Sequence, residues 1–152
     1  MATLTGIATS GKVYGIDYSP ASVAASRRYN AQRIAEGRVD VQEASVSNLP
    51  FERSTFDVVT AIETHYYWPN LSHDLKEIHR VLKPGGSLMI LAETYKGRSL
   101  DWIFRPVMIG LLGATYLSID EHRTALAAAG FSDIQVSVEQ QKGWICAIAR
   151  KG

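Results

Sequence analysis

A carboxylate ends the first short apolar run of the chain. The run Val13–Asp17 reads Val-Tyr-Gly-Ile-Asp, and Tyr18 and Ser19-Pro20 follow it. In α/β folds that bind nucleotides, an acid at the end of a strand accepts hydrogen bonds from ribose hydroxyls, roughly 20 residues after a glycine-rich turn. Asp17 is therefore a candidate ribose ligand, with the Tyr18 ring lying against the adenine. The alternative is that Asp17 only caps the helix that Ser19-Pro20 begins.

A second set of reactive side chains stands together in one short segment. Glu63 is followed, after one residue, by four consecutive rings, His65, Tyr66, Tyr67 and Trp68. Large rings are costly to leave in water, so the run is either a wall of a substrate pocket or a part of the core. His65 could act as a general base toward an acceptor hydroxyl. The segment is therefore a candidate substrate site, with core packing as the alternative.

The composition limits which classes of protein fit. With 152 residues, 46% of them hydrophobic and 20% charged, the chain can bury one ordinary core. A formal net charge of +1 without any basic block does not fit a nucleic-acid-binding protein. The single cysteine, Cys146, and the lack of a signal peptide or membrane-spanning run predict a cytoplasmic protein. The histidines, at 65, 73, 79 and 122, lack the spacing of metal ligands, so no metal is expected.

Strand-like and helix-like segments alternate along the chain. Short apolar runs predict strands at 13–16, 39–42, 56–62, 87–92, 134–138 and 144–149. Helices are predicted at 20–35, at 71–82, where apolar residues recur at helical spacing, and from a capping box at 118–121 to Gly130. The Lys-Pro-Gly-Gly stretch at 83–86 is predicted to end the second of these helices.

This alternation predicts an α/β fold. Uninterrupted apolar strands separated by helices are typical of a doubly wound, mostly parallel sheet covered on both faces. The short Lys142-Gly143 connection leaves no room for a crossover helix, so the last two strands are predicted to form an antiparallel hairpin. No linker or repeat interrupts the chain, and residues 1–152 are predicted to form a single domain.

Four blocks carry a resemblance to a known family. In chain order they read VYGIDYS at 13–19, NLPF at 48–51, FDVV at 56–59 and RVLKPGG at 80–86. Together they resemble class I S-adenosylmethionine-dependent methyltransferases, above all the small-molecule branch of ubiquinone and menaquinone biosynthesis. The resemblance implies a seven-stranded sheet with S-adenosyl-L-methionine as cofactor. It places Asp17 on the ribose, Tyr18 on the adenine, and Glu63 near the sulfonium, where a carboxylate and aromatic faces favour a cation.

The resemblance also implies that the loop after the strand at 39–42 binds the adenine. The family commonly has an aspartate there, whereas this chain has Ser45. A hydroxyl can still accept a hydrogen bond from the adenine amino group, and the Val46 N–H can still donate to the ring. Ser45 and Val46 are therefore candidate cofactor ligands.

The family's first strand and its glycine-rich turn have no counterpart in this sequence. Residues 1–11 look like the tail of the first helix and its loop, so the domain is expected to be N-terminally incomplete. In the family this strand lies between those at 13–17 and 56–62. The two neighbours are expected either to pair directly or to expose edges through which chains self-associate, unless the gene begins upstream.

The function implied by the resemblance is methyl transfer to a small-molecule acceptor. In the family the segment corresponding to 95–116 covers the acceptor, and its apolar side chains imply an apolar or aromatic one: Trp102, Ile103, Phe104, Met108, Leu111 and Leu112. Without the glycine-rich turn, this chain is expected to bind the cofactor weakly or not at all. The alternatives are a degenerate, non-catalytic binding or assembly domain, and a nicotinamide-dependent oxidoreductase, which shares the strand-end acid but not the terminal hairpin.

Overall fold

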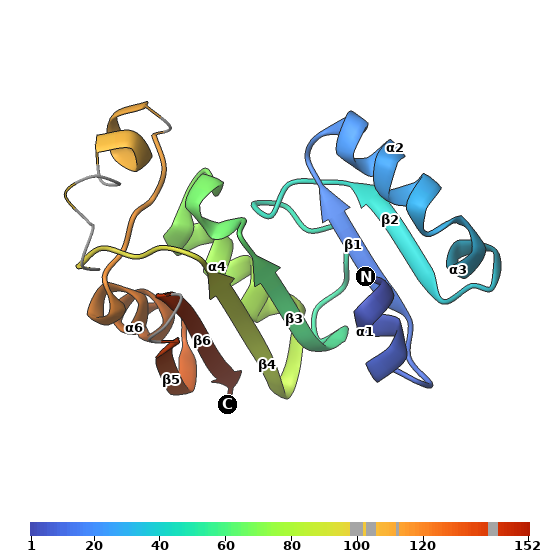
Figure 1. Ribbon diagram of the computed structural model, residues 1–152. Coiled ribbons are helices and arrows are strands. Elements are labelled where there is room, and N and C mark those ends of the chain that lie inside the picture. Colours follow the sequence, from blue (N-terminus) through green and yellow to red (C-terminus); the bar gives the residue numbers. More distant parts are fainter. Residues whose placement is uncertain (98–101, 103–105, 112, 140–142) are drawn as a thin grey trace. The chain divides into compact units, whose positions relative to one another are not determined.

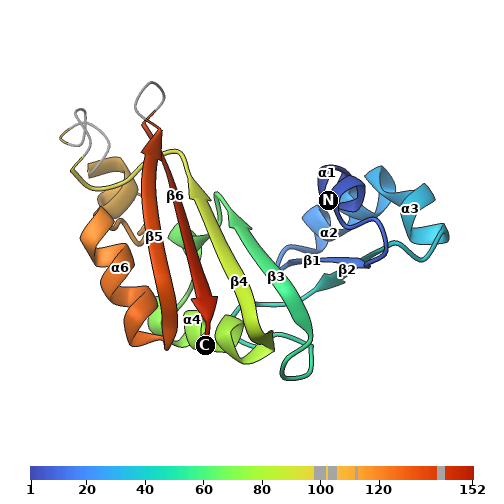
Figure 2. The same cartoon turned by 90° about the horizontal axis from the view of Figure 1, so that it is seen from below.

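The chain forms two compact units, Met1–Pro50 and Phe51–Gly152, drawn as ribbons in Figures 1 and 2. The computed structural model describes residues 1–97, 102, 106–111, 113–139 and 143–152. The single domain expected from the sequence stays a prediction.

Unit 1 contains a two-stranded parallel sheet and three helices. The strands are β1 (Val13–Asp17) and β2 (Val39–Glu43), and they pair in register from Val13 opposite Val39 to Asp17 opposite Glu43. The helices are α1 (Ala2–Ile7), α2 (Pro20–Tyr29) and α3 (Ala31–Ala35). The carboxyl ends of both strands therefore lie at the same edge of this sheet.

The helix predicted at 20–35 is wrong in one respect, because it is broken into α2 and α3 at Asn30. Ser19 caps the start of α2 as expected, since its hydroxyl accepts from the Ser22 N–H at 3.4 Å. At Asn30 the side-chain Nδ2 donates to the Ser26 carbonyl at 2.8 Å. A buried asparagine that bonds to the preceding turn competes with helix continuation.

The core of unit 1 is aliphatic. Its buried members are Val13, Val23, Val39 and Val41, with Met1, Leu4, Ala8 and Ile34 packed against them. Gly15 lets α1 approach β1 closely, because a Cβ there would lie 2.6 Å from the Met1 sulfur. The Met1 side chain at the start of α1 therefore packs directly against Gly15 in the middle of β1.

Unit 2 is a four-stranded mixed sheet. Its strands are β3 (Phe56–Ile62), β4 (Leu82–Ala92), β5 (Phe131–Glu139) and β6 (Trp144–Lys151), in the order β3-β4-β6-β5. Strands β3 and β4 are parallel, and β6 runs antiparallel to both β4 and β5. The antiparallel pairing predicted for the last two strands is confirmed, with β6 lying inside the sheet and β5 at its edge.

Helices cover unit 2 at the ends of its strands and on one face. A 3-10 turn, η1 (His65–Tyr67), follows β3, and α4 (Leu71–Val81) leads into β4. After β4 come a π-helical turn, η2 (Pro106–Leu111), and α6 (Ile119–Ala128). Figure 2 shows α4 and α6 on the same side of the four-stranded sheet. None of the helices among the described residues is long and apolar enough to span a membrane.

The Lys-Pro-Gly-Gly stretch behaves differently from the prediction. Helix α4 already ends at Val81, and residues 82–86 begin β4 with a shift of register against β3. Gly86 permits this close pairing, because a Cβ there would lie 3.1 Å from the carbonyl oxygens of Phe56 and Asp57 in β3. Gly85 has a φ of 75°, which a residue with a Cβ adopts at a cost. The glycines therefore shape the start of the strand rather than the end of the helix.

A lysine on the last strand completes the end of α4. The Lys151 ammonium donates to the carbonyl oxygens of His79 and Leu82, each at 2.8 Å, and to that of Arg80 at 3.5 Å. The carbonyls of His79 and Arg80 are among those that the end of a helix leaves without an intrahelical partner, and Leu82 is the first residue of β4. Lys151 is buried although it is charged, and its three donors each meet an acceptor.

Candidate cofactor and acceptor site

Asp17 lies at the carboxyl end of β1, and one of its two carboxylate oxygens accepts a hydrogen bond. Its Oδ1 accepts a hydrogen bond from the Ser19 N–H at 2.9 Å, next to the start of α2. The other oxygen, Oδ2, accepts none from the residues that the structure describes. Asp17 therefore caps the turn into α2 and still has an oxygen that could accept from a ribose hydroxyl.

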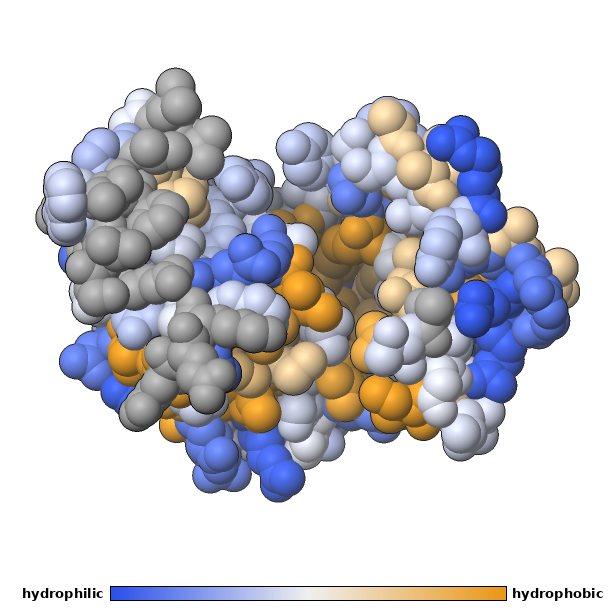
Figure 3. Space-filling view, viewed as in Figure 1, coloured by the Kyte–Doolittle hydropathy of each residue, from blue (hydrophilic) through white to orange (hydrophobic). Residues whose placement is uncertain are grey.

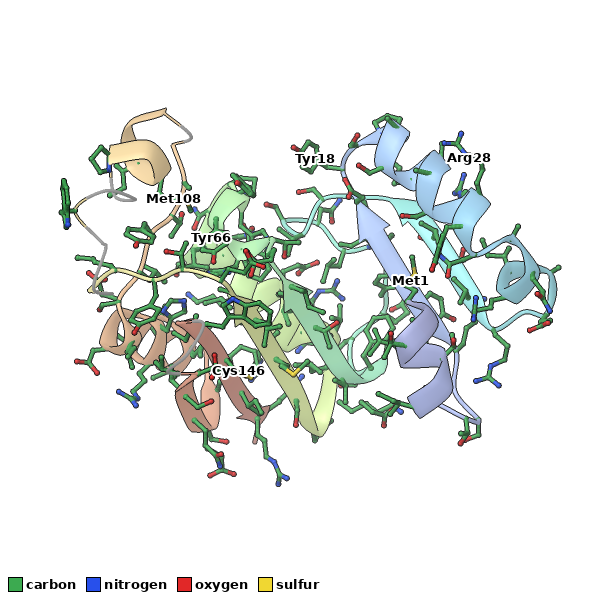
Figure 4. The ribbon with its side chains drawn as sticks, in the orientation of Figure 1. Met1, Tyr18, Arg28, Tyr66, Met108 and Cys146 are labelled. Carbon is green, nitrogen blue, oxygen red and sulfur yellow. The ribbon has the colours of Figure 1, made fainter. Side chains whose placement is uncertain are left out.

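Tyr18 projects beyond this edge of the sheet, as Figure 4 shows. Its side chain is 77% exposed. A large ring left so open beside a free carboxylate oxygen is available to lie against a flat ligand.

The loop after β2 lies at the same end of unit 1. The Ala44 N–H donates to the Asp17 carbonyl oxygen at 3.0 Å, which continues the β1–β2 pairing by one step. Ser45 Oγ accepts from the Ser47 N–H at 3.2 Å, a local turn that fixes the hydroxyl. The Val46 N–H donates to no residue in the described part of the chain. The structure thus places Ser45 and Val46 at the carboxyl edge that carries Asp17.

In unit 2, Glu63 follows β3 in a backbone conformation unusual for a residue with a Cβ. Its φ is 55°, and its carboxylate Oε1 accepts from the Glu93 N–H at 2.5 Å. Burial raises the pKa of the Glu63 carboxyl; the hydrogen bond from the Glu93 N–H opposes this rise, and the nearby Glu93 carboxylate adds to it. Sequence reasoning missed Glu93, although it stands directly after β4 as Glu63 stands after β3. Both carboxylates lie at the carboxyl edge of the parallel β3–β4 pair.

His65 is completely buried, at 0% exposure, in contact with a residue that sequence reasoning also missed. Its Nε2 lies 3.2 Å from Nε2 of His122 in α6. His122 Nδ1 in turn lies 2.7 Å from the Ser118 carbonyl oxygen. Burial, helped by the neighbouring His122, lowers the pKa of His65 to about 3. Two histidines that are 57 residues apart in sequence form one buried pair.

Tyr66 belongs to the hydrophobic core of unit 2. Its hydroxyl donates to the Thr94 carbonyl oxygen at 3.1 Å and accepts from the Thr94 N–H at 3.2 Å. It packs with Ala92, Met108, Ala114, Tyr116 and Ile145. Burial raises the pKa of the Tyr66 phenol, so this hydroxyl stays protonated. The Tyr66 hydroxyl therefore links η1 by hydrogen bonds to the segment that follows β4.

The other two rings of the run point elsewhere. Tyr67 is 55% exposed, and Trp68 is half-buried. The structure therefore divides the run, with His65 and Tyr66 buried, Tyr67 exposed and Trp68 between these extremes. The assignment of all four residues to the acceptor stays a prediction.

The segment after β4 is described only in part. Met108 is buried in the core beside Tyr66, whereas Trp102 and Ile109 are exposed. Of the side chains expected to cover the acceptor, those of Ile103, Phe104, Leu111 and Leu112 lie outside what the structure describes. The Thr115 N–H donates to the Tyr66 carbonyl oxygen at 2.7 Å, so the end of this segment closes against η1. In the described residues, no group of three or more His, Cys, Asp or Glu side chains could hold a metal ion.

Comparison with known proteins decides the family. The model of a methyltransferase domain matches residues 2–90, more than half of the chain. The chain belongs to the methyltransferase domain family. The predicted relationship to class I S-adenosylmethionine-dependent methyltransferases is confirmed.

Curated methyltransferases share part of the sequence. Sterol 4-C-methyltransferase of Caenorhabditis elegans is 38% identical over 79 residues, which are 52% of this chain and 24% of the relative. Demethylmenaquinone methyltransferase of Lactiplantibacillus plantarum is 34% identical over 104 residues, which are 64% of this chain and 44% of the relative. The chain thus matches less than half the length of these relatives.

Solved methyltransferase structures share the fold. A putative sarcosine dimethylglycine methyltransferase from Galdieria sulphuraria superposes with a TM-score of 0.82 at 14% identity, over 99% of this chain and 74% of the other. Human N-acetylserotonin methyltransferase, solved in complex with S-adenosylmethionine, gives 0.74 at 20% identity, over 97% of this chain and 43% of the other. The α/β methyltransferase fold with its antiparallel C-terminal strands is therefore established for this chain.

Proposed function

We propose that this methyltransferase domain binds S-adenosyl-L-methionine and serves the transfer of a methyl group to a small molecule. The observation that carries the proposal is Asp17, which keeps an unbonded carboxylate oxygen at the carboxyl edge of β1 in a chain that matches the methyltransferase domain. Ligands of open α/β sheets bind at this edge.

The residues of unit 1 fit the nucleoside part of the cofactor. Asp17 Oδ2 would accept from the ribose, and the exposed Tyr18 ring would lie on the adenine. The Ser45 hydroxyl and the Val46 N–H would bond to the edge of the adenine. When bound, the cofactor supplies an electrophilic methyl group on a sulfonium. The assignment of Glu63, at the end of β3 in unit 2, to this cation stays a prediction.

The acceptor is proposed to be a small apolar or aromatic molecule. The named relatives act on a sterol and on demethylmenaquinone, both of which have large apolar surfaces. In this chain the exposed Tyr67 ring and the half-buried Trp68 ring would pack against such a molecule. Transfer from a sulfonium needs mainly alignment of donor and acceptor, so these residues would act by positioning.

Calorimetry with S-adenosylhomocysteine tests the proposal. In a full-length parent, Asp17→Ala should weaken binding by about 2–4 kcal/mol, because it removes hydrogen bonds to a charged acceptor worth roughly 1.5–3 kcal/mol each. Glu36→Ala, a carboxylate removed from the C-cap of α3 in the same unit, is the matched control and should bind like the parent. If the two variants bind equally well, Asp17 is not the ribose ligand. If the parent does not bind S-adenosylhomocysteine either, the result favours the alternative of a non-catalytic binding or assembly domain.

We further propose that chains self-associate through the open edge of β3. In the described residues β3 pairs only with β4, and its Val58 and Ile62 side chains are 59% and 49% exposed. Figure 3 shows hydrophobic surface over this strand. An unprotected apolar edge can pair with another chain. The cytoplasmic location stays a prediction.

A further inference from the structure

The buried imidazole pair has its hydrogen atoms fixed by one carbonyl group. The Ser118 carbonyl oxygen can only accept, so His122 Nδ1, at 2.7 Å, carries a hydrogen and donates it. Neutral His122 then has a bare Nε2. The His65 Nε2 at 3.2 Å must therefore carry the hydrogen that joins the two rings. By elimination, Nδ1 of a neutral His65 is a bare acceptor.

This bare nitrogen is buried without a partner. Among the residues that the structure describes, no donor reaches His65 Nδ1, and the side chain is 0% exposed. Buried polar atoms are nearly always satisfied, so an orphan acceptor calls for an explanation such as a ligand or a functional role. The orphan lies in the ring run next to Tyr67, which the proposed function places beside the acceptor.

Both rings are neutral at physiological pH. Burial and the neighbouring His122 lower the pKa of His65 to about 3, and burial lowers the pKa of His122 although the Ser118 carbonyl and the Glu121 carboxylate oppose this. So weak a base takes a proton poorly but still accepts a hydrogen bond. His65 is therefore suited to orient a hydroxyl rather than to deprotonate it.

We propose that His65 Nδ1 accepts a hydrogen bond from a hydroxyl of the acceptor once the side chains that bury it move aside, and that His122 is the positioning residue that holds His65 in the required tautomer. The inference rests on the proposed function and narrows it, because the acceptor then carries an O–H group beside its apolar body. The hydroxyl that is bonded to Nδ1 is held in one orientation, as alignment with a methyl donor requires.

Nitrogen NMR of the histidine side chains tests the tautomers without any assay of methyl transfer. In the ¹⁵N-labelled chain at pH 7, His65 should show a bare Nδ1 and a protonated Nε2, and His122 the reverse. Added 2-naphthol should shift the His65 Nδ1 signal in the direction of hydrogen bonding, whereas 2-methoxynaphthalene, which has no donor, should not. A protonated Nδ1 would overturn the proposal. So would a bare Nδ1 that 2-naphthol leaves unmoved or that both compounds shift alike.

Two variants of His122 separate positioning from packing. His122→Gln offers a carbonyl oxygen to His65 Nε2 and should keep the tautomer and bind 2-naphthol within about twofold of the parent. His122→Leu removes that acceptor, should give a mixture of His65 tautomers, and should weaken 2-naphthol binding about 3- to 10-fold, the equivalent of one neutral hydrogen bond. If His122→Leu does not fold, a mixed tautomer in His122→Gln would still refute the positioning role.

The outcome stays distinct from that of the cofactor experiment. A His65 that responds to 2-naphthol in a chain without affinity for S-adenosylhomocysteine would leave the hydroxyl site standing and remove the proposed function. Cofactor binding that depends on Asp17, together with a His65 that does not respond to 2-naphthol, would support the proposed function and remove the hydroxyl site.

Discussion

Two adjacent tyrosines in η1 have opposite surroundings. Tyr66 bonds through its hydroxyl to both backbone groups of Thr94, whereas Tyr67 is 55% exposed. Tyr66→Phe should lower the free energy of unfolding by about 1–3 kcal/mol, because the Thr94 groups lose their partner inside the core. Tyr67→Phe is the matched control and should change it by less than about 0.5 kcal/mol. Urea titration of both variants measures the difference, and equal effects would mean that the Tyr66 hydroxyl is not needed.

Tyr67, and with it Trp68, should instead contribute to binding of the acceptor. Tyr67→Ala or Trp68→Ala should raise the Michaelis constant for the acceptor while S-adenosylhomocysteine binds as before, because we place both rings on the acceptor side. Steady-state kinetics and calorimetry on the same preparations check this. Loss of cofactor affinity with an unchanged acceptor constant would show that the rings belong to the cofactor instead.

Local residue patterns could be predicted, but contacts between distant residues could not. The capping box was readable because its two partners, Ser118 and Glu121, are three residues apart, and both of its hydrogen bonds form. The positions of Asp17 and Glu63 at strand ends followed from where the apolar runs stop. The His65–His122 pair depends on how α6 packs against η1, across 57 residues, and no local spacing encodes it.

At the scale of elements, apolar runs predicted the existence of the strands better than their ends. β3 has the predicted bounds, 56–62, because its apolar run is bounded by polar residues on both sides. β4 begins five residues earlier than predicted, because Leu82 already pairs with Phe56 of β3, ahead of Gly85 and Gly86. The break of the first predicted helix at Asn30 depends on burial of that side chain, which composition does not show.

The open edge of β3 gives a prediction at this scale. Val58→Lys should abolish concentration-dependent association, because a charge on an edge strand opposes pairing with another chain. Gln135→Lys adds the same charge to β5, the other edge strand of this sheet, and should leave association as in the parent. Light scattering over a concentration series compares the two. Association that survives Val58→Lys would place the interface elsewhere, and a monomeric parent would remove the proposal of self-association.

For the whole molecule, the buried histidines set the response to acid. The pKa of His65 is about 3 in the fold and near 6.5 when unfolded, so the unfolded chain binds the proton first. The stability that His65 contributes is complete above about pH 6.5 and falls with pH below it, by about 1.4 kcal/mol per pH unit until about pH 3. Between pH 6.5 and 5 this amounts to about 2 kcal/mol, and His122 and His79, whose pKa values are also lowered by burial, add in the same direction.

Urea titrations at pH 7, 6 and 5 measure this dependence. His65→Gln should reduce the slope without abolishing it, because one titrating group is gone while His122 and His79 remain. A parent whose stability is constant from pH 7 to 5 would show that the imidazoles are not buried as neutral groups.

The ammonium of Lys151 at the end of α4 also bears on how fast unit 2 can fold. The His79 carbonyl in the last turn of α4 receives its partner from a residue 72 positions later, so the end of α4 is not completed before β6 has entered the sheet. Because β6 lies between β4 and β5, its arrival completes both strand pairings and the helix in one event. Chains dominated by such distant contacts fold in roughly milliseconds to seconds rather than microseconds. Unit 2 should therefore gain its structure late and all at once.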